Sequence, residues 1–154
     1  MKNYLDETDQ KILNLLQSNG RMTNAELAKR IKLSPPSALQ RVRGLERAGY
    51  IRGYAAKLDP ERLGYRITIW AMVSLALHQD QPIERFQQSV LEIPEVVECH
   101  HVSGEFDFLL KILVSDIQAY EVLIRDKLSR VKGIQQIRSS FVLAAPKPTT
   151  QIPI

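Results

Sequence analysis

Hydrophobic residues in the first part of the chain recur at the spacing of amphipathic helices. Residues 6–18 carry leucine and isoleucine on one helical face, and we expect Gly20 to end this helix in a left-handed conformation. Residues 23–31 predict a second helix with a capping box, because Thr23 and Glu26 stand three positions apart and each can bond the backbone of the other. Both segments therefore predict helices whose apolar sides pack together.

A third helix follows after a connection of two residues. It starts at Ser34, a favourable N-cap, with Pro35 at the first helical position, and it stops at Gly49. The apolar side of this helix holds Ala38, Leu39, Val42 and Leu45, and the opposite side holds Ser37, Gln40, Arg41 and Gly44, with Arg43 and Arg47 on its flank. This layout is typical of a helix-turn-helix, in which the polar and cationic side enters the major groove of DNA.

Residues 50–58 predict a short β-hairpin with its turn at Arg52-Gly53, because strand-forming residues flank a turn signal. Three helices and this hairpin make a winged helix-turn-helix, for which we expect the boundaries 1–56. The sequence Asp-Pro-Glu then interrupts the pattern, and we expect a linker at 57–64.

Beyond the linker the hydrophobic period shortens from about 3.6 residues to about 2, which marks a change from helix to strand. We expect strands at 66–77, 96–103, 106–114 and 134–144, and helices at 82–91 and 116–131. The order β-α-β-β-α-β is the ferredoxin-like arrangement. The predicted fold class is therefore α+β: a winged helix-turn-helix, a ferredoxin-like domain at 65–145 and a tail at 146–154.

The first predicted strand has large apolar residues on both of its faces. Trp70 and Met72 alternate with the small and branched apolar residues of the other face. A face exposed to water rarely carries such groups, so we interpret this side of the sheet as covered by another subunit.

Composition narrows the class of protein. The chain has 154 residues, 44% of them hydrophobic, which suits a globular protein with a core. It has no apolar run of about 18 residues and no signal-peptide pattern at its start, so we expect no membrane contact and a cytoplasmic location. Cys99 is the only cysteine, which excludes an internal disulfide and a cysteine-based zinc site.

The charge is divided unevenly along the chain. Residues 1–60 contain 11 of the 21 Lys and Arg and 6 of the 17 Asp and Glu, a net charge of +5, whereas the remainder carries −1. Since the excess positive charge coincides with the helix-turn-helix pattern, we expect a polyanion, double-stranded DNA, as the partner of this half.

Several stretches together resemble one family. They are LDETDQKILNLLQSNGR from position 5, LSPPSALQRVRGLERAGYI from 33, SGEFDFLLKI from 103, and SSFVL and TTQIPI near the end. Across essentially its whole length the chain resembles the Lrp/AsnC transcription regulators. The resemblance implies a DNA-binding N-terminal half and a C-terminal RAM domain that forms homodimers and higher oligomers, often octamers, and binds an amino-acid effector.

Two positions depart from the family pattern. Gly44 stands where the family usually has a basic residue, so it costs the helix about 1 kcal/mol relative to alanine and removes one cation from the groove-facing side. Ala38 stands where many members have cysteine; this position faces the core, and we expect no functional consequence.

The predicted DNA contacts divide into base and phosphate contacts. Arginine reads guanine and glutamine reads adenine through paired hydrogen bonds, so Arg41 and Gln40 are the expected base contacts. At the start of the second helix the backbone can donate to a phosphate, although Thr23 there serves equally well as a cap. The other expected DNA-binding residues are Arg43, Arg47 and Arg52 for phosphates, Ser37 for either, and Asn24 and Ser34 at helix starts.

The expected effector site is the turn at 103–107. Ser103, Gly104, Glu105, Phe106 and Asp107 follow one another there. Glycine lets a ligand approach the backbone, and a carboxylate can pair with an α-ammonium group; without the resemblance, a purely structural hairpin turn is the favoured reading. The resemblance implies that Gly104 to Asp107 bind the amino acid at a subunit interface, and that Ser139 and Ser140 line the pocket.

We expect no catalytic residue, metal site or cofactor. His100 and His101 are adjacent on a predicted strand, so their rings face opposite ways and cannot share a metal ion. The alternative is an enzyme on the same scaffold, similar to the sirohaem decarboxylases, in which one of these histidines would act. Such an enzyme has no need for the cationic helix face, and we therefore favour a regulator.

Overall fold

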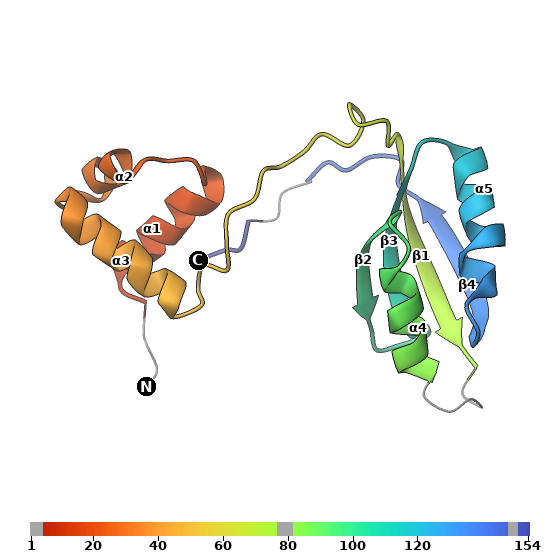
Figure 1. Ribbon diagram of the computed structural model, residues 1–154. Helices are drawn as coiled ribbons and strands as arrows, with labels where there is room; N and C mark the ends of the chain where they lie inside the picture. Colours follow the sequence, from red (N-terminus) through yellow and green to blue (C-terminus); the bar gives the residue numbers. More distant parts are fainter. Residues whose placement is uncertain (1–4, 77–81, 148–150) are drawn as a thin grey trace. The chain divides into compact units, whose positions relative to one another are not determined.

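The computed structural model describes residues 5–76, 82–147 and 151–154. They form two compact units. The first unit is made by residues 1–57 together with 147–154, and the second by 58–146 (Figure 1). The segment that we expected as a separate tail is thus largely part of the first unit.

Three helices build the first unit: α1 (Glu7–Ser18), α2 (Asn24–Ile31) and α3 (Pro35–Arg47). The predicted capping box is present at Thr23, and Ser34 caps α3 by accepting a hydrogen bond from the Ser37 N–H. The helices close around a small core in which Ile12, Leu27, Ala28 and Ala38 are almost fully buried. Leu39, which we placed on the apolar side of α3, is instead 38% exposed.

Two further expectations for this unit are wrong. Gly20 does not take a left-handed conformation; α1 ends at Ser18 with Asn19 as its C-cap, and the left-handed residue of the helix-turn-helix is Lys32, with φ 58°. No strand forms at 51–59, so the expected hairpin is absent. The N–H groups of Tyr50 and Ile51 instead donate to the Leu45 carbonyl at the end of α3, which removes them from strand pairing.

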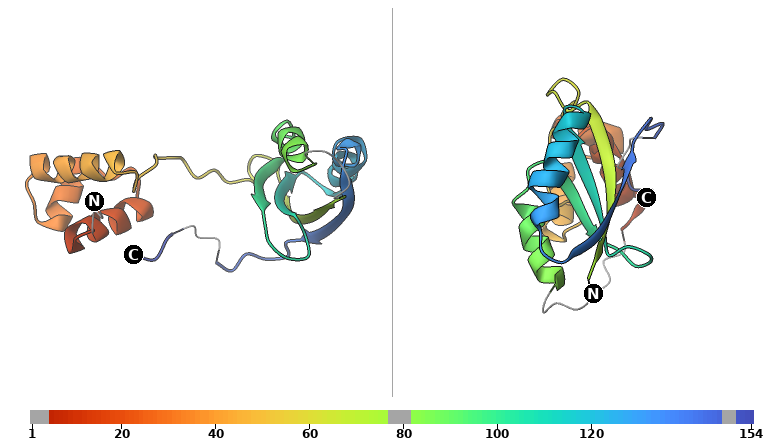
Figure 2. Two further views of the ribbon diagram at one scale, coloured as in Figure 1. Left: turned by 90° about the horizontal axis from the view of Figure 1, so that it is seen from below. Right: turned by 90° about the vertical axis from the view of Figure 1, so that its right-hand side faces the viewer.

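The second unit has the predicted β-α-β-β-α-β order. Its elements are β1 (Ile67–Leu75), α4 (Pro82–Leu91), β2 (Val96–His101), β3 (Phe108–Val114), α5 (Ile117–Asp126), a short 3₁₀ helix (Leu128–Arg130) and β4 (Ile134–Phe141). The strands form one antiparallel sheet in the order β2-β3-β1-β4, and α4 and α5 cover one of its faces (Figure 2).

Several element ends differ from the expectation. β2 stops at His101 and β3 starts at Phe108, so the turn between them is longer than expected. This turn also contacts β1, since the Asp107 N–H donates to the Val73 carbonyl at 3.0 Å. The last helix ends early at Asp126, and β4 ends at Phe141. The expected extension of the first strand to Leu77 lies outside the described residues.

The two faces of the sheet differ in burial. Ile69, Ala71 and Val73 of β1 are fully buried under the helices. Trp70 and Met72 alternate with them on the opposite face and are only half-buried, as the period of two requires. In the part of the chain that the structure describes, no helix has the length and apolar character needed to cross a membrane.

Candidate functional site

The start of α3 is held by side chains that we expected on DNA. Ser34 is occupied as the N-cap, and its hydroxyl lies 2.8 Å from that of Ser37. Asn24 Nδ2 donates to the Pro35 carbonyl at 2.8 Å, so this side chain bridges α2 and α3. The turn between the two helices is therefore fixed by local hydrogen bonds.

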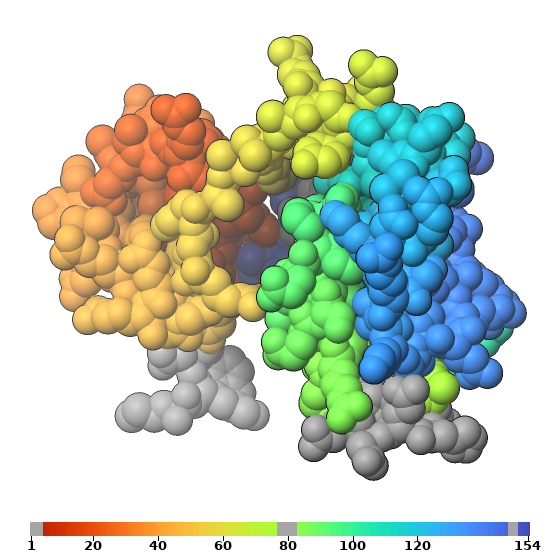
Figure 3. Space-filling model, turned by 45° about the vertical axis from the view of Figure 1, so that its right-hand side comes forward, coloured from red at the N-terminus to blue at the C-terminus, as the bar shows by residue number. Residues whose placement is uncertain are grey.

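The exposed side of α3 is centred on Gln40, Arg43 and Arg47. These side chains border a shallow hollow of about 500 Å³ together with Pro36, Leu39 and Glu46. Residues of α3 belong to the open surface of the first unit (Figure 3, orange). The Arg47 Nε donates to the Arg43 carbonyl at 3.2 Å, which leaves the rest of its guanidinium available. This face offers an amide and two guanidinium groups to a ligand.

Arg41 lies beside the exposed side of α3 and is bound to residues at the start of α1. Its Nη1 donates to Asp6 Oδ2 at 2.7 Å and to Asp9 Oδ1 at 2.8 Å. The hydrogen bonds that Arg41 donates to Asp6 and then to Asp9 raise the pKa of Arg41, while the pKa of Asp6 is lowered by the Asp9 backbone N–H and next by Arg41. Arg41 therefore joins α3 to the start of α1.

Arg52 and Tyr54 follow α3 in the segment that we expected to form the wing. The Tyr54 hydroxyl donates to Glu46 Oε1 at 3.1 Å. Burial, and then the hydrogen bond to Glu46, raises the pKa of this tyrosine. Arg52 borders a second cavity of the same unit, so it is not part of the hollow along α3.

The turn at 103–107 has an open backbone and a charged pair. Gly104 has φ 129°, and nothing lies within 4 Å of where a Cβ would stand. Glu105 Oε1 accepts from Arg138 Nη1 of β4 at 2.8 Å, and the Arg138 guanidinium lies 5.3 Å from the centre of the Phe106 ring. Both side chains are at least half exposed. A charged group of a ligand can therefore replace either partner of this ion pair at a small cost in free energy.

Asp107 has a structural contact in the same turn. Its Oδ2 accepts from the Leu75 N–H at 2.7 Å and so closes the end of β1. Asp107, one of the residues expected at the effector site, thus has a hydrogen bond within the fold. Glu105 remains as the accessible carboxylate of this turn.

Ser139 and Ser140 lie on opposite faces of the sheet. Ser139 bonds the Tyr120 hydroxyl of α5 on the helix-covered face; burial raises the pKa of Tyr120, and the bond to Ser139 opposes that shift. Ser140 is paired with Trp70 in the register of β1 and β4. The expectation that both serines line one pocket therefore fails within a single chain, because neighbouring residues of a strand alternate in direction.

The two histidines also face opposite ways. His100 Nε2 lies 3.1 Å from Glu98, which accepts from Lys111 at 2.9 Å, while the His101 ring stacks on Phe108. Among the described residues, no group of three or more His, Cys, Asp or Glu side chains is placed to hold a metal ion.

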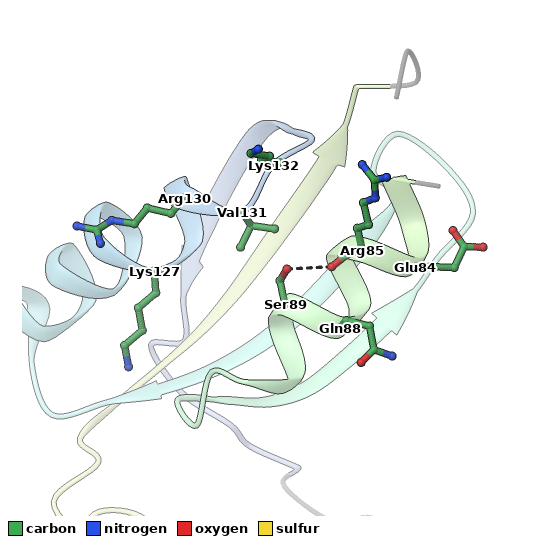
Figure 4. A pocket seen from close by; sticks show the side chains of 8 residues that line it. All are labelled: Glu84, Arg85, Gln88, Ser89, Lys127, Arg130, Val131 and Lys132. Atoms are coloured by element: carbon green, nitrogen blue, oxygen red, sulfur yellow. Dashed lines mark hydrogen bonds between the residues drawn. The ribbon is translucent and has the colours of Figure 1, made fainter. Parts of the chain in front are cut away.

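The sequence reasoning missed two features. Arg138 had not been connected with the turn, because its distance along the chain hides the pairing with Glu105. A hollow of about 530 Å³ between α4 and residues 127–132 was also missed. Figure 4 shows Arg85 and Ser89 on one side of this hollow and Val131 and Lys132 on the other, with the Arg130 side chain pointing away.

Comparison with known families assigns both units. The model described as Lrp/AsnC ligand binding domain matches residues 68–152, and the model described as winged helix-turn-helix DNA-binding matches residues 5–52. The helix-turn-helix and the sheet thus each correspond to a known type of domain.

Whole-chain relatives agree with these matches. The leucine-responsive regulatory protein of Escherichia coli (strain K12) is 41% identical over 150 residues, which cover 97% of this chain and 92% of that protein. A Neisseria meningitidis transcriptional regulator, crystallised as a complex with L-Met, is 42% identical with a TM-score of 0.94 over 97% of each chain. An AsnC family regulator from Agrobacterium tumefaciens is 34% identical with a TM-score of 0.89 over 96% of each chain.

Proposed function

This chain belongs to the Lrp/AsnC family of transcriptional regulators, and we propose that an amino acid controls how it binds DNA or assembles. One observation carries the proposal: the chain aligns from end to end with a regulator whose crystal structure is a complex with L-Met. The effector domain and the DNA-binding domain therefore occur here in the same combination and order.

We propose that α3 is the recognition helix, with Gln40 as a base contact and Arg43 and Arg47 as phosphate contacts. This assignment is supported by the exposure of the three side chains on one side of α3. Arg41 reaches a base only if DNA draws it away from Asp6 and Asp9, so we rank it below Gln40 as a base contact. Arg52 and Ser37 remain proposed phosphate contacts beside this face.

The proposed effector site combines the Gly104 backbone with Glu105 and Arg138. A zwitterionic amino acid carries one ammonium and one carboxylate group. An exposed Glu–Arg pair 2.8 Å apart supplies the two complementary charges, and the guanidinium is suited to a carboxylate in a bidentate contact. Ser103, Phe106 and Ser140 are proposed to complete the site, which supports a free amino acid as the effector class.

We propose a homodimer that forms through the outer face of the sheet, and higher assembly up to an octamer. The half-buried Trp70 and Met72 on that face support this assignment, because a second sheet would cover them. A symmetric dimer presents two copies of α3, which suits a roughly palindromic operator. A cytoplasmic location accords with access to DNA.

The relatives are named as regulators, and we propose no catalytic role for this chain. The alternative of tetrapyrrole chemistry is tested by an absorbance titration with a sirohaem analogue. A saturable spectral change at stoichiometric protein would contradict the assignment as a regulator without enzymatic activity.

The effector is tested by a thermal-shift screen of the twenty amino acids, beginning with L-methionine. A ligand at about 100 times its dissociation constant adds about 2.7 kcal/mol to the free energy of unfolding, a shift that is easily measured. Glu105→Gln and Arg138→Gln should each weaken the affinity for the amino acid at least about tenfold, since each removes one complementary charge.

Glu121→Gln is the matched control, because Glu121 forms an exposed ion pair with Arg125 on α5 away from the turn. If no amino acid shifts the melting temperature, the effector class is wrong. If an amino acid acts equally well on all variants, the site is wrong.

A further inference from the structure

The last described residues of the chain, 151–154, bind to α1 of the DNA-binding unit. We call their binding site on α1 the seat. Ile152 meets Gln17 of α1 through two hydrogen bonds: the Ile152 N–H donates to Gln17 Oε1 at 2.9 Å, and the Ile152 carbonyl accepts from Gln17 Nε2 at 2.8 Å. On either side, Gln151 Nε2 donates to Ser18 Oγ at 3.1 Å and Asn14 Nδ2 donates to the Ile154 carbonyl at 3.5 Å.

The chemistry of Gln17 is suited to this segment. A primary amide presents one donor and one acceptor next to each other, as a residue of a neighbouring strand does when it exchanges both backbone bonds with its partner. Pro153 follows directly and has no N–H that would need a partner. The amide thus recognises an extended backbone.

Hydrogen bonds hold the segment more than burial does. It borders a cavity of about 500 Å³ that is lined by residues of α1 and by 50–54. Ile152 and Ile154 nevertheless remain 66% and 46% exposed, so their apolar contribution is small. A seat of this kind can be occupied and vacated without unfolding the helices beneath it.

The segment is connected, along the chain and through its contacts, to two regions for which functions are proposed above. Upstream it continues from β4, whose Arg138 pairs with Glu105 of the effector turn. At its seat it bonds α1, whose Asp6 and Asp9 hold Arg41 of α3. The effector turn and the recognition helix are therefore linked by these side-chain contacts and by the covalent chain, in addition to the linker at 57–64.

We propose that residues 151–154 form a strap that docks on Gln17 and transmits the state of β4 to the DNA-binding unit. The site is a receptor on α1 for an extended peptide, and its occupant is the C-terminal segment of this same chain. The proposal rests on the proposed function, because it assigns the route by which an effector at Glu105 and Arg138 changes DNA affinity.

The seat is tested first without any effector. In the full-length protein, Gln17→Ala removes both bonds to Ile152, so we expect the Ile152 amide to exchange with deuterium about ten times faster or more, measured by NMR. Gln10→Ala is the matched control, because Gln10 is an exposed glutamine of the same helix. Unchanged exchange at Ile152 in Gln17→Ala overturns the strap.

The transmission is tested by the ratio of operator dissociation constants with and without L-methionine. The wild type and Gln10→Ala should have the same ratio, whereas the ratio of Gln17→Ala should approach one. Calorimetric binding of L-methionine to Gln17→Ala should remain as in the wild type, which separates lost transmission from a lost effector site. An undiminished ratio in Gln17→Ala overturns the proposed route.

A wild type that does not respond to L-methionine or to any other amino acid contradicts the proposed function instead. The strap is then judged by the exchange of the Ile152 amide alone. If a peptide Gln-Ile-Pro-Ile added in trans shifts the α1 signals of the wild type at low concentration, the seat is not occupied by its own chain and the proposal fails.

Discussion

At the scale of single residues, Gly44 and Gly49 differ in what their backbones require. Gly44 lies inside α3 with open space at its Cβ position, whereas Gly49 has φ 79°. Gly44→Ala should therefore raise the free energy of unfolding by about 1 kcal/mol, and Gly49→Ala should lower it by about 1–2 kcal/mol because a side chain is strained at positive φ. Urea denaturation followed by circular dichroism measures both. A loss of stability in Gly44→Ala would contradict the open surroundings of this glycine.

The acid sensitivity of the DNA-binding unit should depend on Asp6. The Asp9 backbone N–H, and next Arg41, lower the pKa of the Asp6 carboxyl from 3.8. A group whose pKa is lowered in the folded state stabilises the protein above its ordinary pKa and loses this effect as the pH falls through the folded pKa.

Asp6→Asn keeps a good N-cap but leaves Arg41 with Asp9 alone. The variant should melt below the wild type at about pH 7 and approach it at about pH 2. Glu7→Gln, an exposed change in the same turn, is the control. A difference between wild type and Asp6→Asn that stays constant down to about pH 2 would show that the Asp6 charge has no role.

At the scale of elements, the end of β1 depends on a side chain of a distant turn. Asp107 accepts the Leu75 N–H in a partly buried position, so Asp107→Ala leaves a donor without its partner and should cost about 1–3 kcal/mol. Asp107→Asn keeps a side-chain oxygen and should cost less. Urea denaturation followed by the fluorescence of Trp70 measures the difference. Equal costs for both variants would mean that this hydrogen bond does not stabilise the strand.

Helix α3 should separate base reading from phosphate binding. Gln40→Ala should reduce discrimination between operator and unrelated DNA by about 1–3 kcal/mol without changing the salt dependence. Arg43→Ala should weaken binding to both and reduce the slope of log affinity against log salt by about 1. Fluorescence anisotropy between about 50 and 200 mM salt measures both quantities. A wild-type affinity that does not vary with salt would contradict phosphate contacts by this face.

At the scale of the whole molecule, the outer face of the sheet should decide assembly. Trp70→Glu and Met72→Glu place a charge where the proposed dimer buries apolar surface, so both should shift the protein toward monomers in sedimentation velocity. Leu91→Glu makes the same kind of change at a 75% exposed position on α4 and should leave assembly unchanged. Circular dichroism checks that each variant is folded. If folded Trp70→Glu assembles as the wild type does, the interface lies elsewhere.

The sequence alone predicted what depends on neighbours along the chain. Hydrophobic periods of about 3.6 and about 2 identified the helices and strands. Capping signals at Thr23 and Ser34 located the starts of α2 and α3, since caps act within a few residues. The order of elements then implied the ferredoxin-like unit, and the charge division indicated a polyanion partner. The order and type of the main elements depend on local sequence, and the structure confirms them with changes in element ends, apart from the expected hairpin at 50–58.

Only the tertiary structure decided which charges are already paired. Arg41 is bound by aspartates of α1, Asp107 by the end of β1, and Glu105 by Arg138. No period or motif reports such contacts, because they join residues that are more than thirty positions apart. The seat of Ile152 on Gln17, 135 positions away, has the same origin. Folding brings distant side chains together, and their pairing determines which groups remain available for DNA and effector.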